Sequence, residues 1–120
     1  MAQSVLRISK LPDAALEAAG AFHTHVAGEL RKATEALPEG GDMVVIFPPA
    51  PHDHTAWREA AVQDLARAAA PRHRFNAIVG EREDDIDAVL AYLADAPGVT
   101  GQVFTLDEIN GQDGNPAKSD

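Results

Sequence analysis

Residues 75–106, FNAIVGEREDDIDAVLAYLADAPGVTGQVFTL, decide the fold. Phe75–Val79 is short, apolar and followed by a glycine, which is typical of a strand. Asp84–Asp95 carries apolar side chains at helical spacing, and Gln102–Leu106 follows a Pro-Gly turn as a second strand. A strand, a helix and a strand joined by short connections predict one turn of parallel α/β winding.

The chain before this stretch repeats the same winding. Ser4–Ser9 and Met43–Phe47 predict two further strands, and the second is a continuous apolar run, as expected of a strand buried on both faces. Helices are predicted over Asp13–Leu37 and over Ala56–Ala70, with Thr55 as the N-cap of the second. The alternation predicts an α/β fold: a Rossmann-like parallel sheet of about four strands with crossover helices.

The composition along the chain predicts the domain limits. A single domain is expected over residues 1–107, and the polar segment 108–120 is expected to be a flexible tail.

The spacing of apolar residues predicts which face of each helix is buried. Residues three or four apart share a helix face. The predicted stripes are Leu16, Ala19, Val26, Leu30, Ala33 and Leu37, interrupted at His23; then Trp57, Ala61, Leu65 and Ala68; then Ile86, Val89, Leu90 and Leu93.

Composition narrows the class of protein. The 120-residue chain has a formal net charge of −9 and no cysteine, so it offers neither a disulfide framework nor a thiolate site. Nucleic acid is disfavoured as a partner, because binding a polyanion needs a basic surface. No apolar run is long enough to cross a bilayer, and the N-terminus MAQSVLRISK lacks the apolar core of a signal peptide. A cytoplasmic protein with no membrane partner is therefore expected.

Three segments in register resemble the C-terminal half of the short-chain dehydrogenase/reductase (SDR) family. They are GDMVVIF, REAAVQDLARAAAPRHRFNAIVGE and AVLAYLADAPGVTGQVFTLD, and together they cover residues 41–107. The resemblance implies half of an NAD(P)-binding fold. It also implies that the first two helices share one face of the sheet and that the third helix lies on the other face.

The functional positions of that family hold other residues in this chain. The resemblance places the family's catalytic tyrosine and lysine on Thr55 and Glu59, and its serine on Pro48. Threonine cannot supply the phenolic acid, glutamate reverses the local charge, and proline has no hydroxyl. No Gly-x-x-x-Gly-x-Gly phosphate-binding turn occurs, and the family's cofactor-contacting Pro-Gly is Val79–Gly80. No catalytic residue and no cofactor are therefore predicted, and Tyr92 is interpreted as a packing residue.

Three groups of residues have side chains of types that bind metal ions: a histidine pair, a loop cluster and an acidic run. His52, Asp53 and His54 lie in a predicted loop and could bind a divalent ion only with a fourth ligand from elsewhere, so a structural role is favoured. His23 and His25 lie two apart on a helix and do not face each other. The acidic run 81–85 is interpreted as carboxylates at the favourable end of a helix dipole. No metal is predicted.

Three functional hypotheses follow, in order of preference. The first is a non-catalytic module that forms a homo-oligomer or binds a full-length SDR, because the first two helices correspond to those that form the family's four-helix dimer interface. Its expected interface residues are Ala27, Leu30, Trp57 and Ala61, and the first strand is expected to be an open sheet edge. The second is a small-molecule-binding protein, and the third an oxidoreductase-related enzyme with new chemistry at His52, Asp53 and His54. Both would use the remnant cleft near residues 48–57, at the carboxyl end of a strand; its expected lining is Pro48, Pro49, His52, His54 and Thr55.

Overall fold

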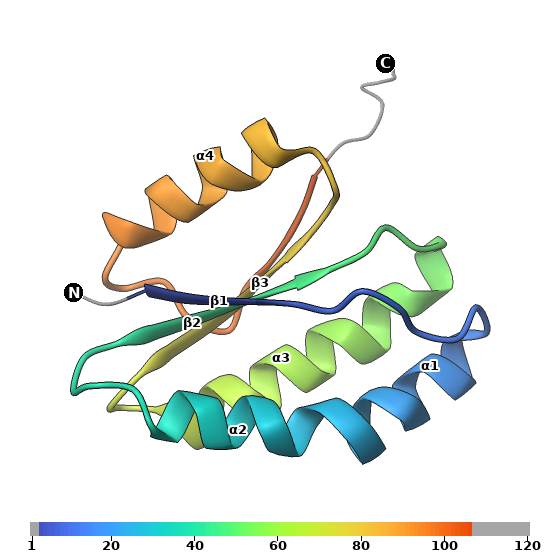
Figure 1. Ribbon diagram of the computed structural model, residues 1–120, viewed down its shortest axis with the longest axis horizontal. Helices are drawn as coiled ribbons and strands as arrows, with labels where there is room; N and C mark the ends of the chain where they lie inside the picture. The colour runs from blue at the N-terminus through green and yellow to red at the C-terminus, as the bar shows by residue number, and fades with distance from the viewer. Residues whose placement is uncertain (1–2, 107–120) are drawn as a thin grey trace.

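The computed structural model describes residues 3–106 of the chain (Figure 1). Four parallel strands form one sheet in the order β1-β2-β3-β4, which confirms the predicted parallel α/β fold. The predicted tail, residues 108–120, lies outside the described residues. The strands are β1 Gln3–Arg7, β2 Asp42–Phe47, β3 Arg74–Val79 and β4 Val103–Thr105.

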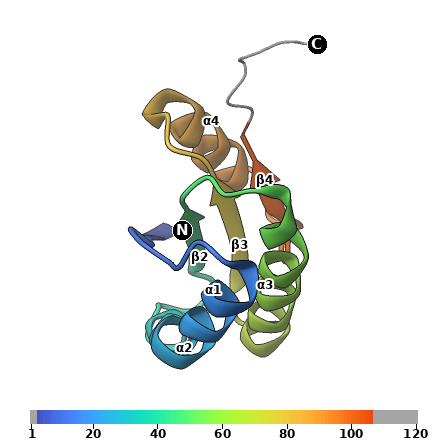
Figure 2. The ribbon, with the colours of Figure 1, turned by 90° about the vertical axis from the view of Figure 1, so that its right-hand side faces the viewer.

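Helices cover both faces of the sheet, with the first two predicted helices on one face and the third on the other (Figures 1 and 2). This is the arrangement that the resemblance implied. The path on the first face runs through an α-helix, a π-helical turn and a second α-helix before α3, and α4 covers the second face. The elements are α1 Ala15–Ala21, η1 Phe22–Val26, α2 Ala27–Glu35, a 3-10 turn η2 His52–His54, α3 Thr55–Ala69 and α4 Glu83–Ala94.

The sheet separates two apolar cores, because successive side chains of a strand point to opposite faces. Every residue of β2 is buried, as its continuous apolar run predicted. Met43, Val45 and Phe47 face α1–α3, and Val44 and Ile46 face α4. On the α4 face the core also contains Ile78, Ile86 and Leu93, so the predicted inward stripe of that helix is confirmed at two buried positions.

The first helix differs from its prediction in phase. It begins at Ala15 instead of Asp13, and Leu16 is 86% exposed, so its assignment to the buried stripe was wrong. In η1 the amide of Ala27 donates to the carbonyl of Phe22, five residues earlier, which adds a residue to one turn. A constant helical period cannot follow this shift. The buried stripe is Ala18, Phe22, Leu30 and Thr34.

In α3 the buried face lies about one residue further round the helix than the predicted face. Thr55 is its first residue and not its N-cap; that position belongs to His54, whose side chain caps no amide. The stripe was placed partly on Ala68, which is exposed. The side chains that face the sheet are Arg58, Ala61, Val62 and Ala66, so one of the helix's four buried residues is an arginine.

Tyr92 of α4 packs less than its sequence suggested. Its ring meets Phe104 edge-on with centroids 6.0 Å apart, and the residue is still 53% exposed.

No helix among residues 3–106 is long and apolar enough to span a membrane.

An ion pair joins the first residues of the two central strands. Asp42 and Arg74 are register partners, and their side chains are 7% and 13% exposed. The Nε atom of Arg74 donates to Asp42 at 2.8 Å, a second guanidinium nitrogen donates to the other carboxylate oxygen, and the third donates to the carbonyl of Ala96 just beyond α4. The pair therefore fixes the register of β2 and β3 and ties α4 to the sheet.

Candidate functional site

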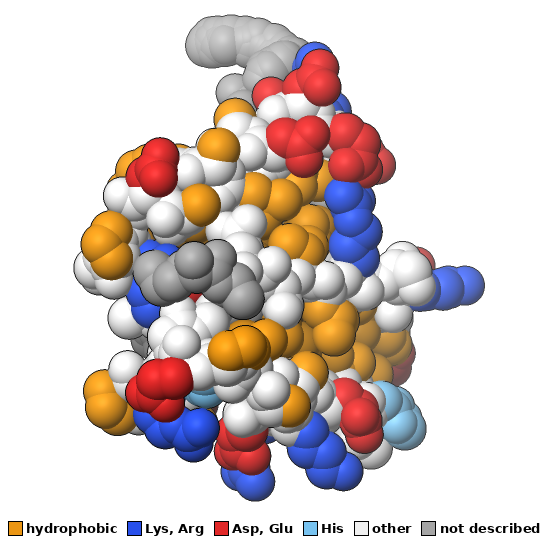
Figure 3. All heavy atoms as spheres, turned by 60° about the vertical axis from the view of Figure 1, so that its left-hand side comes forward, with side chains coloured by type: hydrophobic (Ala, Val, Ile, Leu, Met, Phe, Trp, Pro, Cys, Tyr) orange, Lys and Arg blue, Asp and Glu red, His pale blue; other side chains and the backbone are white. Residues whose placement is uncertain are grey.

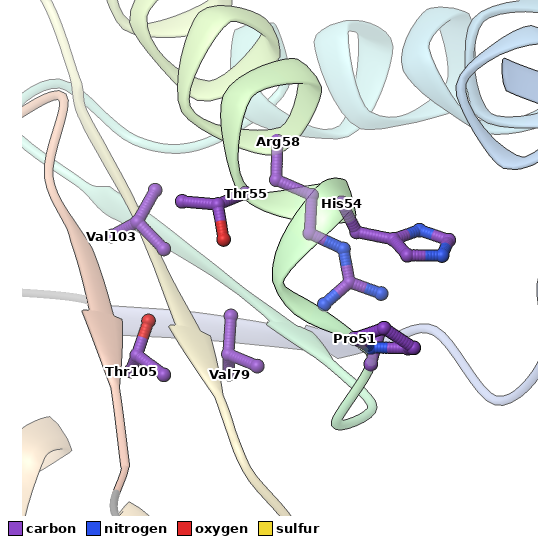
Figure 4. A pocket seen from close by; sticks show the side chains of 8 residues that line it. Pro51, His54, Thr55, Arg58, Val79, Val103 and Thr105 are labelled. Atoms are coloured by element: carbon purple, nitrogen blue, oxygen red, sulfur yellow. The ribbon is translucent and has the colours of Figure 1, made fainter. Parts of the chain in front are cut away.

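Two neighbouring hollows lie at the carboxyl end of the sheet, where the chain leaves β2 and enters α3. Their volumes are about 160 Å³ and about 40 Å³, and they share Ala50, Pro51, His54 and Arg58. The larger is also lined by Leu11, Pro12, Asp13, Pro48 and Pro49; the smaller by Thr55, Val79, Val103 and Thr105 (Figure 4). The sequence placed the cleft at this end of the sheet because ligands of parallel α/β sheets bind there.

Arg58 lines both hollows and is the residue that the sequence analysis missed. It is 4% exposed, and its guanidinium extends from the first turn of α3 toward Pro51 (Figure 4). One nitrogen donates to the carbonyl of Pro48 at 2.9 Å, and the guanidinium carbon lies 4.6 Å from the centre of the Phe47 ring. Burial lowers the pKa of Arg58 below its ordinary value, because the charged form loses hydration.

No carboxylate compensates this charge within residues 3–106. The ion pairs of the described chain involve other arginines, and the Nε atom of Arg58 is buried without a hydrogen-bond partner. A buried cation ordinarily has a counter-charge, since desolvating it alone costs several kcal/mol. Arg58 thus contrasts with Arg74, whose buried charge is matched by Asp42.

His54, by contrast, is fully engaged by the protein. Its Nδ1 atom accepts a hydrogen bond from Trp57 Nε1 at 3.2 Å, so the proton resides on Nε2, which donates to the carbonyl of Asp13 at 2.8 Å. Neither ring nitrogen has a lone pair available for a metal ion. His54 therefore joins α3 to the loop before α1, and it is a structural residue of the cleft wall.

Of the other predicted cleft residues, three line the hollows and one does not. Pro48 and Pro49 line the larger hollow and Thr55 the smaller, whereas His52 is exposed and lines neither. His23 and His25 are exposed on η1, at the far end of α1 from the cleft. Among residues 3–106 no group of three or more histidine, cysteine, aspartate or glutamate side chains could hold a metal ion.

A separate groove runs between α2 and α3 on the outer surface of the helical layer. It has a volume of about 360 Å³, and its walls combine small side chains with charges of both signs. The lining residues are His23, Ala27, Gly28, Arg31, Lys32, Ala61, Asp64, Leu65 and Ala68. Of the predicted interface residues, Ala27 and Ala61 line this groove. Leu30 is fully buried in the core, so its side chain is absent from the surface, and Trp57 packs among Phe22, Phe47 and His54.

Comparison with known protein families gives a match over residues 6–106 to the family described as short chain dehydrogenase-like protein. The chain belongs to this family. The resemblance seen in residues 41–107 is thereby confirmed, and it extends to β1 and the first helix. A search among curated proteins found no match.

The residues of this short chain dehydrogenase-like protein do not fit a nicotinamide dinucleotide. The sequence contains no Gly-x-x-x-Gly-x-Gly turn for a pyrophosphate, and the connection from β1 to α1 contains Pro12 and no glycine. Gly80 is retained, but a Cβ atom there would lie 2.8 Å from Leu106 Cδ1, so the chain itself fills the space beside it. The resemblance places the family's tyrosine and lysine on Thr55 and Glu59, and Glu59 is exposed.

One sequence signal could have identified Arg58. It lies three residues before Ala61 and four before Val62, on the apolar stripe of a helix that starts at the carboxyl end of a strand. A charged residue in the middle of a stripe that must face the sheet is an exception that needs a partner. The predicted stripe contained Trp57 and did not include Arg58.

Proposed function

We propose that this protein is a non-catalytic short chain dehydrogenase-like module that assembles as a homo-oligomer, with α2 and α3 of one copy packing against those of another. The observation that carries the proposal is the groove of about 360 Å³ between these two helices. The absence of catalytic function is proposed from Pro48, Thr55 and Glu59, which cannot perform the proton transfer of the resembling family.

The composition of the groove supports close approach of a second copy. Ala27, Gly28 and Ala68 line it, and space is open around Gly28, where an added Cβ atom would meet nothing within 4 Å. Small side chains allow helix backbones to approach closely. Arg31 and Lys32 on α2 and Asp64 on α3 provide both signs of charge, which a two-fold axis can bring together because the same patch meets itself.

One of the two edges of the described sheet, strand β1, supports a second contact in the same assembly. Among the described strands β1 has a neighbour on one side only, and Val5 in its middle is 42% exposed. Figure 3 shows hydrophobic side chains gathered at the height of β1, between α4 above and α1–α2 below. Open edges and apolar patches favour association. If the protein proves monomeric, this edge favours a full-length SDR as its partner.

A matched pair of glycine substitutions tests the α2–α3 surface. Gly28 lines the groove and Gly20 lies outside it on α1; both are exposed, and an added Cβ atom would meet nothing within 4 Å at either. Sedimentation velocity of the wild type at micromolar concentration should give a dimer or larger species. Gly28→Glu should shift it to monomer, because the larger side chain would occupy the space into which the second copy packs, and Gly20→Glu should leave the wild-type species unchanged.

Two results would count against the proposal. A monomeric wild type of normal stability would reject self-assembly and leave binding to a full-length SDR, which co-purification with such an enzyme would then test. An unchanged oligomer for Gly28→Glu would move the contact away from the groove and toward the β1 edge.

A further inference from the structure

The two hollows at the carboxyl end of the sheet meet at a charge that the described chain leaves uncompensated. Arg58 is 4% exposed, makes no ion pair within residues 3–106, and has a buried Nε atom with no hydrogen-bond partner. Its one described hydrogen bond goes to a backbone carbonyl, which carries no net charge. A planar guanidinium presents five donors in a fork that matches the two oxygens of a carboxylate or phosphate.

We propose that Arg58 anchors a binding site for the oxyanion of a small ligand, a carboxylate or phosphate group, at the carboxyl end of the sheet. The ligand supplies the negative charge that the described part of the protein lacks. Bidentate pairing with the free side of the guanidinium would satisfy the unpaired Nε atom, because Nε and one terminal nitrogen form one edge of the fork.

The smaller hollow suits the anion better than the larger one. Its lining contains no carboxylate, and the hydroxyls of Thr55 and Thr105 can donate to an oxyanion there (Figure 4). The larger hollow is also lined by Asp13, whose charge would repel an anion. The charged group is therefore assigned to the side of Thr55 and Thr105, with the remainder of the ligand extending past Pro51 into the larger space.

The size of the hollows limits the ligand to a small molecule. Their volumes of about 160 Å³ and 40 Å³ lie below the roughly 300 Å³ at which pockets for drug-sized ligands begin. A dinucleotide would not fit, whereas a phosphate or a short carboxylic acid would. The site shares no residue with the α2–α3 groove, so it is independent of the proposed assembly.

Titration with two simple anions tests the proposal on the full chain. Thermal unfolding is followed in sodium phosphate and in sodium acetate, each against sodium chloride at equal ionic strength, and affinities are measured by calorimetry. The wild type should show a saturable increase in Tm with at least one anion. Arg58→Met should weaken binding at least about tenfold, and Arg58→Lys should retain part of it because the charge remains without the fork.

An exposed arginine provides the control. Arg72 pairs with Glu39 on the surface and lines neither the two hollows nor the α2–α3 groove, and Arg72→Met should bind the anions as the wild type does. Equal responses to chloride and to both probe anions, or an unchanged affinity in Arg58→Met, would overturn the proposal. Binding that emerges only when Asp107→Asn and Glu108→Gln are introduced would assign the site to carboxylates of the chain's own terminal segment and would overturn the proposal of an external ligand.

Discussion

Arg58 and the largely buried Arg74 should respond differently to the same substitution, because within residues 3–106 only Arg74 has a buried carboxylate partner. In Arg74→Met, the Asp42 side chain, 7% exposed, would keep its charge and lose its partner. Removing one member of a buried ion pair costs about 3–5 kcal/mol. The carbonyl of Ala96 after α4 would lose its donor as well, so the upper part of this range is expected.

Arg58→Met removes a charge that nothing in the described chain balances. The losses are a hydrogen bond from a charged donor, about 1.5–3 kcal/mol, and a cation–π contact with Phe47, about 0.5–2 kcal/mol. Relief of the desolvation of an uncompensated ion, several kcal/mol, offsets them. The net change should lie within about 1 kcal/mol of zero, since the methionine side chain also fills much of the space.

Urea unfolding monitored by circular dichroism measures both values, with all variants at one protomer concentration because assembly shifts apparent stability. The double variant Asp42→Leu/Arg74→Met should recover much of the loss, since it leaves no buried charge. If Arg58→Met lowers the free energy of unfolding by about 3 kcal/mol or more, as the loss of a buried ion-pair partner does, Arg58 is a structural residue and the argument for a ligand fails. If Arg74→Met lowers it by less than about 1 kcal/mol, the account of the Asp42–Arg74 pair is wrong.

Two further outcomes are expected. Gly80→Ala should destabilise the protein by about 1–3 kcal/mol, because its Cβ atom would lie 2.8 Å from Leu106 Cδ1 at the end of β4; Gly98→Ala, where space is open, should stay within about 0.5 kcal/mol of the wild type in the same urea experiment. Calorimetric titration with NADH and NADPH should give no binding at micromolar concentrations, because Leu106 fills the space beside Gly80 and no glycine turn follows β1; a micromolar Kd for either would contradict this reasoning.

The features that follow from short-range pattern were predictable. The apolar run of β2 and the winding of strands and helices were foreseen, since buried parallel strands and crossover connections leave a direct imprint on composition and spacing. The distribution of the helices over the two sheet faces was foreseen from the family resemblance. The position of Phe22 was not, because the π-turn between α1 and α2 changes the helical phase after Ala21. The Asp42–Arg74 pair was missed because it requires knowledge of the β2–β3 register.

Arg58 was missed for a reason that also bears on function. The resemblance implies that the family's cation on this helix corresponds to Glu59, which is exposed in this chain, whereas the residue before it is a buried arginine. One residue corresponds to about 100° of helix rotation. Arg58 therefore contacts the carbonyl of Pro48 and the ring of Phe47, whereas Glu59 is exposed to solvent. The carboxyl end of the sheet thus carries a positive charge at a buried position in the first turn of α3. Packing alone would favour an apolar residue at this position, as at Ala61 and Val62.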